Sequence, residues 1–377
     1  MRSLLRKIYM GSGESSWILE GLCTTSDGND ARPLLRPAAG KKYHRLRWAL
    51  TTISLIGLTA AARSAEPLQL AQTIPIPDVA GRMDHMAIDV RGRRLFVAAL
   101  ENNTVEVIDL RAGKWLRSLS GFSKPQGVFY APDVNKLFVA SGKDGTCKSF
   151  DGKSFALLST EKLSLGADLV DYDRRSKQLY VGHGGKDAGN GYGELAVIDA
   201  ISGRKAANLQ VEAHPGAILI GDDARVFVTV PDEGHILVLD RKTHAIRQNW
   251  AVEGNPHTTS VALDEAHHRL FVGTRKPAMI VVLDSESGKE VVRMPTVDTL
   301  DGIFFDRATR RIYASGGEGF VDVQQQTDPD HYEPVAHLAT RANARTSLFV
   351  PEMSELMVAI PKAADQLAEI RVFKVRP

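Results

Sequence analysis

The sequence predicts an all-β protein, a seven-bladed β-propeller, and two observations support this prediction. A short apolar motif similar to Leu-Phe-Val occurs seven times, and successive copies start 42, 42, 47, 44, 42 and 44 residues apart. A second apolar run, Val-x-Val-Ile-Asp in the first unit, usually ends 14 residues after the first motif begins. Propeller blades repeat about every 40–45 residues. The seven copies begin at Leu95, Leu137, Leu179, Val226, Leu270, Ile312 and Leu356.

Each repeated unit has the pattern of four short antiparallel strands. Runs of β-branched and aromatic residues alternate with turn residues, as such strands require. The interval between the two motifs grows to 20 residues in the third unit and to 18 in the seventh. We therefore expect insertions between the second and third strands of these units, at Gly182–Gly193 and Lys362–Leu367.

An aspartate ends the second motif in most units, and its spacing indicates a turn rather than catalysis. Asp109, Asp199 and Asp284 are each followed four residues later by Gly. An Asp side chain accepts backbone N–H bonds in a tight turn, and Gly supplies the positive φ that the turn needs. Asp151 and Asp240 keep the carboxylate but lack the Gly. Turn chemistry explains why the aspartate recurs from blade to blade.

The last unit needs a fourth strand from elsewhere in the chain. It ends at Pro377, directly after its third strand. The segment Leu68–Pro75 resembles the fourth-strand segment Glu290–Pro295, because both are apolar runs that end in Pro. We expect the N-terminal strand to complete the seventh blade, which closes the ring and leaves no open blade edge.

A secretory signal is predicted at residues 41–65, before the propeller at 66–377. Lys41–Arg47 is basic, and Trp48–Ala62 is a mostly apolar run without a charge. This run is shorter than the roughly 20 apolar residues of a spanning helix, and small residues follow it, as at a cleavage site. We expect a cut after Ala62 or Ser64, so that the mature chain starts between Arg63 and Glu66 and is periplasmic or secreted without a stable membrane span. An uncleaved membrane anchor is the alternative.

Residues 1–40 show no periodic pattern and are expected to be an unstructured extension or a mis-assigned start. Of the two cysteines, only Cys147 follows the predicted cleavage site, so the mature monomer has no internal disulfide. Residues 1–65 carry a charge of +6 (10 Lys and Arg, 4 Asp and Glu), which leaves 2 − 6 = −4 for residues 66–377. A mildly acidic propeller argues against nucleic-acid binding, which depends on clustered Lys and Arg.

The blade pattern resembles a known family. A Leu-Phe-Val triplet followed by Val-x-Val-Ile-Asp is similar to the YVTN-repeat, YncE-like seven-bladed propellers of bacterial envelopes, and the resemblance covers residues 66–377. Asn102–Val105 is similar to the Asn-rich turn between the second and third strands of that family. The resemblance implies the fold and an envelope location but no single activity, because fold does not determine function.

Candidate site residues are expected at one mouth of the central channel. The innermost strand of each blade starts there, so polar residues 10–13 positions before each Leu-Phe-Val motif should converge. His183 is a candidate because its insertion should lie above the same mouth. Asp84 is a candidate because it is adjacent to His85 in the sequence. The remaining candidates are His85, Gln126, Asp168, His214, His257, Asp301 and Arg345.

Three functions fit such a mouth. The first is a monomeric, non-enzymatic binding protein for a small molecule or an envelope protein, which needs no cofactor. The second is hydrolysis of a cyclic ester, by resemblance to the seven-bladed propeller lactonases. A His would act as general base, and Arg345 would stabilise an anionic intermediate. The third is a metal-binding envelope protein, with a zinc-like ion held by three histidines and by Asp168 or Asp301. The three histidines are His85, His214 and His257.

Overall fold

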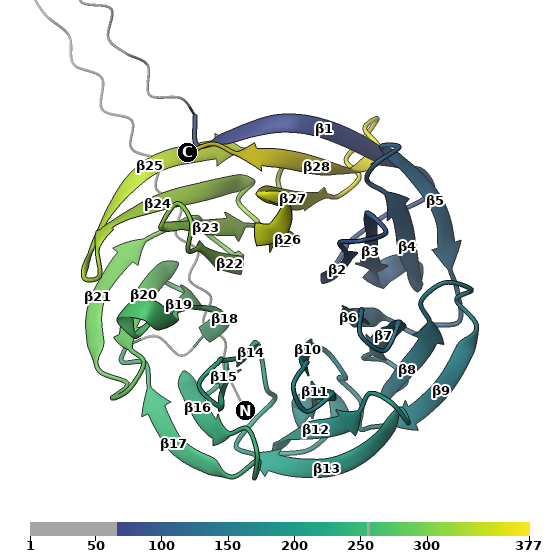
Figure 1. Cartoon of the computed structure of the whole chain (residues 1–377), viewed down its shortest axis with the longest axis horizontal. Helices are drawn as coiled ribbons and strands as arrows, with labels where there is room; N and C mark the ends of the chain where they lie inside the picture. Colours follow the sequence, from purple (N-terminus) through teal and green to yellow (C-terminus); the bar gives the residue numbers. More distant parts are fainter. Residues whose placement is uncertain (1–65, 255–256) are drawn as a thin grey trace, which may run out of the picture. The chain divides into compact units, whose positions relative to one another are not determined.

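The computed structural model describes residues 66–254 and 257–377, which form a seven-bladed β-propeller of seven four-stranded antiparallel sheets. Figure 1 shows the sheets arranged radially, with the first strand of each blade nearest the axis and the fourth at the outside. The expected extension (1–40) and signal (41–65) lie outside the described residues. Within the described residues, no helix is long and apolar enough to cross a membrane.

The blades follow one another along the chain. Blade 1 contains β2 (Met86–Asp89), β3 (Arg94–Ala99), β4 (Thr104–Asp109) and β5 (Lys114–Leu119). Blade 2 contains β6 (Pro125–Ala131), β7 (Lys136–Ser141), β8 (Thr146–Asp151) and β9 (Leu157–Lys162). Blade 3 contains β10 (Val170–Asp173), β11 (Gln178–Gly184), β12 (Gly193–Asp199) and β13 (Arg204–Val211). Blade 4 contains β14 (Ile218–Ile220), β15 (Arg225–Val230), β16 (His235–Asp240) and β17 (Ile246–Ala251).

The remaining blades and four short 3-10 helices complete the fold. Blade 5 contains β18 (His257–Asp264), β19 (Arg269–Arg275), β20 (Met279–Asp284) and β21 (Glu290–Pro295). Blade 6 contains β22 (Leu300–Asp306), β23 (Arg311–Gly316), β24 (Phe320–Asp328) and β25 (His331–Ala339). Blade 7 contains β26 (Ser347–Val350), β27 (Glu355–Ile360), β28 (Ala368–Val375) and β1 (Leu68–Ile76). The 3-10 helices are η1 (Leu100–Asn102), η2 (Gly185–Ala188), η3 (Glu265–His267) and η4 (Pro351–Met353).

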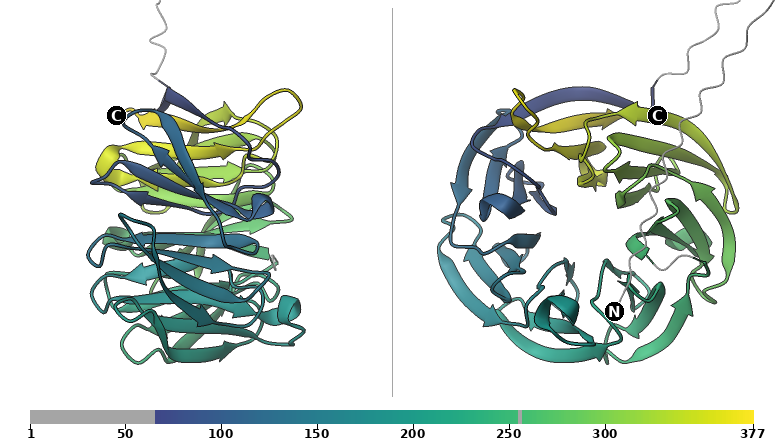
Figure 2. Two further views of the ribbon diagram at one scale, coloured as in Figure 1. Left: turned by 90° about the vertical axis from the view of Figure 1, so that its right-hand side faces the viewer. Right: turned by 180° about the vertical axis from the view of Figure 1, so that it is seen from behind.

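The N-terminal strand closes the ring, as predicted. β1 runs antiparallel to β28, in a register from Leu68 opposite Val375 to Ile76 opposite Ala368. The two strands lie side by side at the outer edge in both face views (Figures 1 and 2). Leu68, Ile74 and Ile76 are each at most 2% exposed, so the strand contributes to the core as well as to the sheet.

The core consists of layers between neighbouring blades. Each of the seven apolar clusters joins residues of two adjacent sheets, because both faces of the second and third strands are covered. The second residue of each Leu-Phe-Val motif is a large side chain that fills such a layer. These residues are almost fully buried: Phe96, Phe138, Tyr180, Phe227, Phe271, Tyr313 and Met357.

The recurring aspartates form the predicted turns. Asp109 Oδ1 accepts hydrogen bonds from the backbone N–H groups of Arg111 (2.9 Å) and Ala112 (2.8 Å), and Gly113 follows with φ 64°. Where the Gly is missing, Phe155 (φ 60°) and His244 (φ 59°) adopt the same left-handed conformation. In the first five blades the aspartate is the constant part of the turn, since even a bulky residue occupies the glycine position.

Replacing Asp109 with Ala should therefore destabilise the propeller by about 1 kcal/mol, because two N–H groups lose their acceptor. Asp109→Asn should recover most of this loss, since an amide oxygen can accept the same bonds. Arg111→Ala, in the same turn, is the matched control because its N–H remains. Equilibrium unfolding in urea measures the differences, and an Asp109→Ala protein as stable as Arg111→Ala would contradict the assigned role.

Candidate functional site

A cavity of about 650 Å³ lies along the propeller axis. The innermost strands of all seven blades line it, and most lining side chains are apolar, among them Phe129, Leu169, Leu219, Phe304 and Leu348. The lining residues differ in exposure: Val261, Ala262 and Leu263 of β18 are all buried. In β6, by contrast, Phe129 is half-buried at the channel, whereas its neighbours on either side are buried. The channel therefore has a mainly apolar wall.

On the first strand of blade 3, a carboxylate interrupts the apolar wall. Asp171, on β10, borders the cavity and is partly exposed to it. Its Oδ1 accepts the N–H of Tyr172 at 2.8 Å, and its Oδ2 accepts the N–H of Ile220, on the first strand of the next blade, at 3.3 Å. Burial raises the pKa of Asp171 to about 6; the two N–H donors oppose this rise and Asp173 adds to it. The side chain is an acid that ionises close to neutral pH.

An ion pair lies where the first strands end. Glu265 and Arg307 follow β18 and β22, and both line the cavity. Arg307 Nη2 lies 2.9 Å from Glu265 Oε2, and Glu265 also accepts the N–H of Asp222 at 2.5 Å. At this end of the channel, the basic and the acidic group neutralise each other.

A charged cluster lies where the first strands begin. Arg82 Nη2 donates to Asp84 Oδ1 at 2.9 Å, and His85 Nε2 lies 3.8 Å from both Asp84 Oδ1 and Asp168 Oδ1. Asp84 is only 1% exposed, and its Oδ2 finds no hydrogen-bond partner within the described residues. Burial raises the pKa of Asp84, an effect that His85 opposes and Asp168 reinforces.

The same cluster extends to the other side of the mouth. Asp301 accepts a hydrogen bond from Arg275, and its Oδ2 lies 3.3 Å from Arg345 Nε. Burial lowers the pKa of Arg345, and Asp301 offsets part of this decrease. Burial also disfavours the charged form of Arg82, but nearby carboxylates, Asp84 first, raise its pKa overall. Side chains from non-adjacent blades thus form one largely neutral network.

The structure brings five of the nine predicted site residues into this mouth cluster: Asp84, His85, Asp168, Asp301 and Arg345. Of the nine, only His85 borders the channel cavity. His257 begins β18 and is paired in register with Arg275, the partner of Asp301. Gln126 is 7% exposed. Its Oε1 packs so closely against Gly142 that a Cβ at position 142 would clash with it.

Of the two remaining histidines, His183 lies on β11 of blade 3, and His214 lies in the connection from blade 3 to blade 4. His183 is 1% exposed, accepts the N–H of Ser164 at Nδ1 (3.3 Å) and donates from Nε2 to Asn208 (3.0 Å). Burial lowers the pKa of His183, so the ring is neutral. His214 donates from Nδ1 to the carbonyl of Gly184 (3.2 Å) and lines a separate cavity of about 200 Å³. In residues 66–254 and 257–377, no three His, Cys, Asp or Glu side chains are placed to hold a metal ion.

Sequence reasoning missed five charged residues at the channel and its mouth: Arg82, Asp171, Glu265, Arg275 and Arg307. Arg275 has a readable signal: it lies five positions after its Leu-Phe-Val motif begins, where the other units have Leu, Gly, Gly, Pro, Gly and Pro. The second strand ends at the face where the first begins, so this position faces the mouth. Asp171 also stands out, eight positions before its motif begins, where the other units are apolar. Arg82 lies in an irregular loop and has no repeat counterpart to compare.

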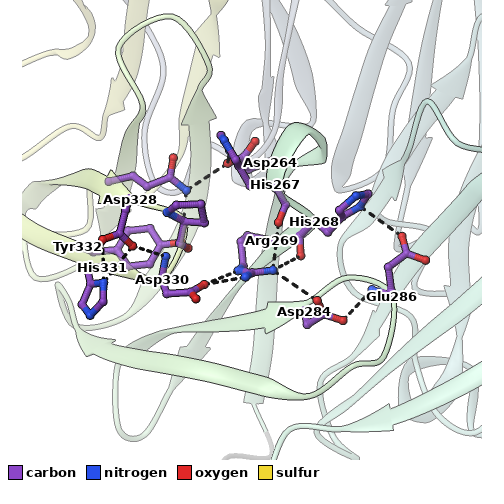
Figure 3. A network of polar contacts seen from close by, with 12 residues as sticks. Asp264, His267, His268, Arg269, Asp284, Glu286, Asp328, Asp330, His331 and Tyr332 are labelled. Atoms are coloured by element: carbon purple, nitrogen blue, oxygen red, sulfur yellow. Dashed lines mark hydrogen bonds and ion pairs between the residues drawn. The ribbon is translucent and has the colours of Figure 1, made fainter.

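A different polar network ties blades 5 and 6 together away from the cavity (Figure 3). Arg269 Nη2 lies 2.7 Å from Asp330, its Nη1 lies 3.3 Å from Asp284, and it donates to the carbonyl of His267. His267 Nδ1 in turn lies 2.7 Å from the buried Asp264. None of these residues lines the channel, so we assign the network to blade packing.

Comparisons with known proteins support the fold. A chain of Kuenenia stuttgartiensis hydrazine synthase is similar with a TM-score of 0.66 and 15% identity, over 78% of this chain and 97% of that chain. A chain of a mitotic checkpoint complex is similar with a TM-score of 0.69 and 13% identity, over 88% and 99%. These likenesses concern the fold alone. No family model and no curated protein matches the sequence.

Proposed function

We propose that the mature chain is an exported binding protein of the bacterial envelope, related to the YVTN-repeat propellers, that holds a small and largely apolar molecule in its central channel. The axial cavity of about 650 Å³ carries this proposal. Sites for small molecules typically measure roughly 300–1,000 Å³ and combine an apolar, aromatic lining with a few polar groups. The seven inner strands provide such a lining. The protein binds and releases the molecule without a chemical reaction.

The charged mouth has a supporting role in this proposal. Its arginines are already paired, Arg82 with Asp84, and Arg275 and Arg345 with Asp301. An anionic intermediate would have to displace Asp301 before Arg345 could stabilise it, so the geometry favours binding over hydrolysis. The cluster joins blades across the mouth, and the apolar surface below it supplies the affinity.

Filling the channel tests the proposal. The neutral fluorescent probe N-phenyl-1-naphthylamine should bind the mature chain with one molecule per propeller. Leu219→Trp places a larger ring in the cavity and should weaken this binding at least roughly tenfold, because the ligand loses the space it needs. Leu116→Trp, on the outer strand β5 at a 41% exposed position, is the matched control. Equal probe affinity in the two variants would contradict binding in the channel.

A further inference from the structure

We infer that the channel ligand is an organic cation, a quaternary or protonated amine on an apolar body, and that Asp171 supplies its counter-charge. This inference rests on the proposed channel-binding function and specifies the chemistry of the ligand.

In every blade, one residue of the first strand is paired in register with the second residue of the Leu-Phe-Val motif. These equivalent residues are Ala87, Phe129, Asp171, Leu219, Ala262, Phe304 and Leu348. Six of the seven are apolar, and all but Ala87 line the cavity. The fold itself therefore accepts an apolar side chain at this position, and the carboxylate in blade 3 is an exception that packing does not require.

Asp171 has no cationic partner within the described part of the chain. Its carboxylate oxygens accept hydrogen bonds from the backbone N–H groups of Tyr172 and Ile220. Of the basic side chains that line the cavity, Arg307 is paired with Glu265 at the far end, and His85 lies at the mouth beside Asp84 and Asp168. A carboxylate in an apolar wall is costly to ionise without a counter-charge. A cationic ligand would provide that charge.

The rest of the wall fits the same ligand class. Phe129 and Phe304 present aromatic rings to the cavity, and a ring face attracts an ammonium group. The aliphatic side chains around them suit the apolar body of the molecule. An anionic ligand would meet Asp171 without a free cation nearby, so the wall disfavours anions. Burial keeps the pKa of Asp171 near 6, which agrees with a site that lacks its counter-charge.

Three probes with one benzyl body and different charges test the inference: benzyltrimethylammonium, benzyl alcohol and phenylacetate. Calorimetric titration at pH 8 should show benzyltrimethylammonium binding the wild type at least roughly tenfold more tightly than benzyl alcohol, and phenylacetate binding least. Asp171→Asn should remove the preference for the cation while leaving benzyl alcohol affinity within about twofold. Asp168→Asn, which removes a carboxylate of the mouth cluster, is the matched control and should keep the preference.

The outcomes separate this inference from the proposed function. The role of Asp171 would be overturned if Asp171→Asn still preferred the cation. It would also be overturned if Asp168→Asn lost that preference instead. Equal binding of the three probes, blocked by Leu219→Trp, would overturn the cationic ligand but leave the channel as a binding site. Failure of all three probes and of N-phenyl-1-naphthylamine to bind would overturn both. Unchanged benzyl alcohol binding in Asp171→Asn also shows that this variant is folded.

Discussion

Deletion of Leu68–Ile76 should lower the melting temperature of the propeller by roughly 15 °C or more. The segment contributes β1, which is the outer strand of blade 7 and pairs with β28 along its length. Deletion removes three large buried side chains, Leu68, Ile74 and Ile76. Each such loss costs about 2–5 kcal/mol as transfer energy plus the cavity left behind. It also exposes the backbone edge of β28, which favours association between molecules.

Single substitutions on the same strand make this prediction quantitative. Ile74→Ala removes a side chain that is 0% exposed and should cost about 3 kcal/mol, or roughly 6 °C. Leu70→Ala removes a side chain of the same size that is 51% exposed, and it should change the melting temperature little. Differential scanning calorimetry on the three variants measures the effects. A deletion variant that melts within about 3 °C of the wild type would refute the structural role of the closing strand.

Asp171→Asn should raise the stability of the ligand-free propeller at pH 8 by about 1–2 kcal/mol. Burial raises the folded-state pKa of Asp171 from its ordinary value of 3.8 to about 6. Two pKa units correspond to about 3 kcal/mol. The gain is smaller than that because the side chain is partly exposed to the channel and because Asn loses one of the two bonds to backbone N–H groups.

The sign of this effect depends on pH. A raised carboxyl pKa means that the folded state holds its proton more tightly than the unfolded chain. The contribution of Asp171 to stability is therefore most favourable below pH 4 and declines as the pH rises from about 4 to 6. Urea unfolding at pH 4 and pH 8 should show a larger gain from Asp171→Asn at pH 8. Asp187→Asn, at an exposed position in the blade 3 insertion, is the control, and equal gains at both pH values would contradict the prediction.

The mouth shows how far the repeat could predict a site. Counting back from each Leu-Phe-Val motif placed Asp84, His85, Asp168, Asp301 and Arg345 at one mouth, because the first strand pairs with the motif strand in nearly the same register in every blade. The same count also predicts that His214, which follows blade 3, lies at the channel mouth. In the folded protein, Gly184, the last residue of β11, accepts a hydrogen bond from His214, and this histidine lines a smaller cavity instead of the channel.

Seven blades, the turns between third and fourth strands and the closing strand were all predictable from the amino-acid sequence. Each of these follows from residues close together in the chain or from a pattern that every unit repeats. The pairing of charges at the mouth and the burial of Asp171 became apparent only in the folded ring. Arg82, Asp168 and Asp301 come from distant parts of the sequence, and Asp171 gains its altered pKa from burial against another blade. Contacts between blades depend on the ring as a whole, so local sequence patterns do not encode them.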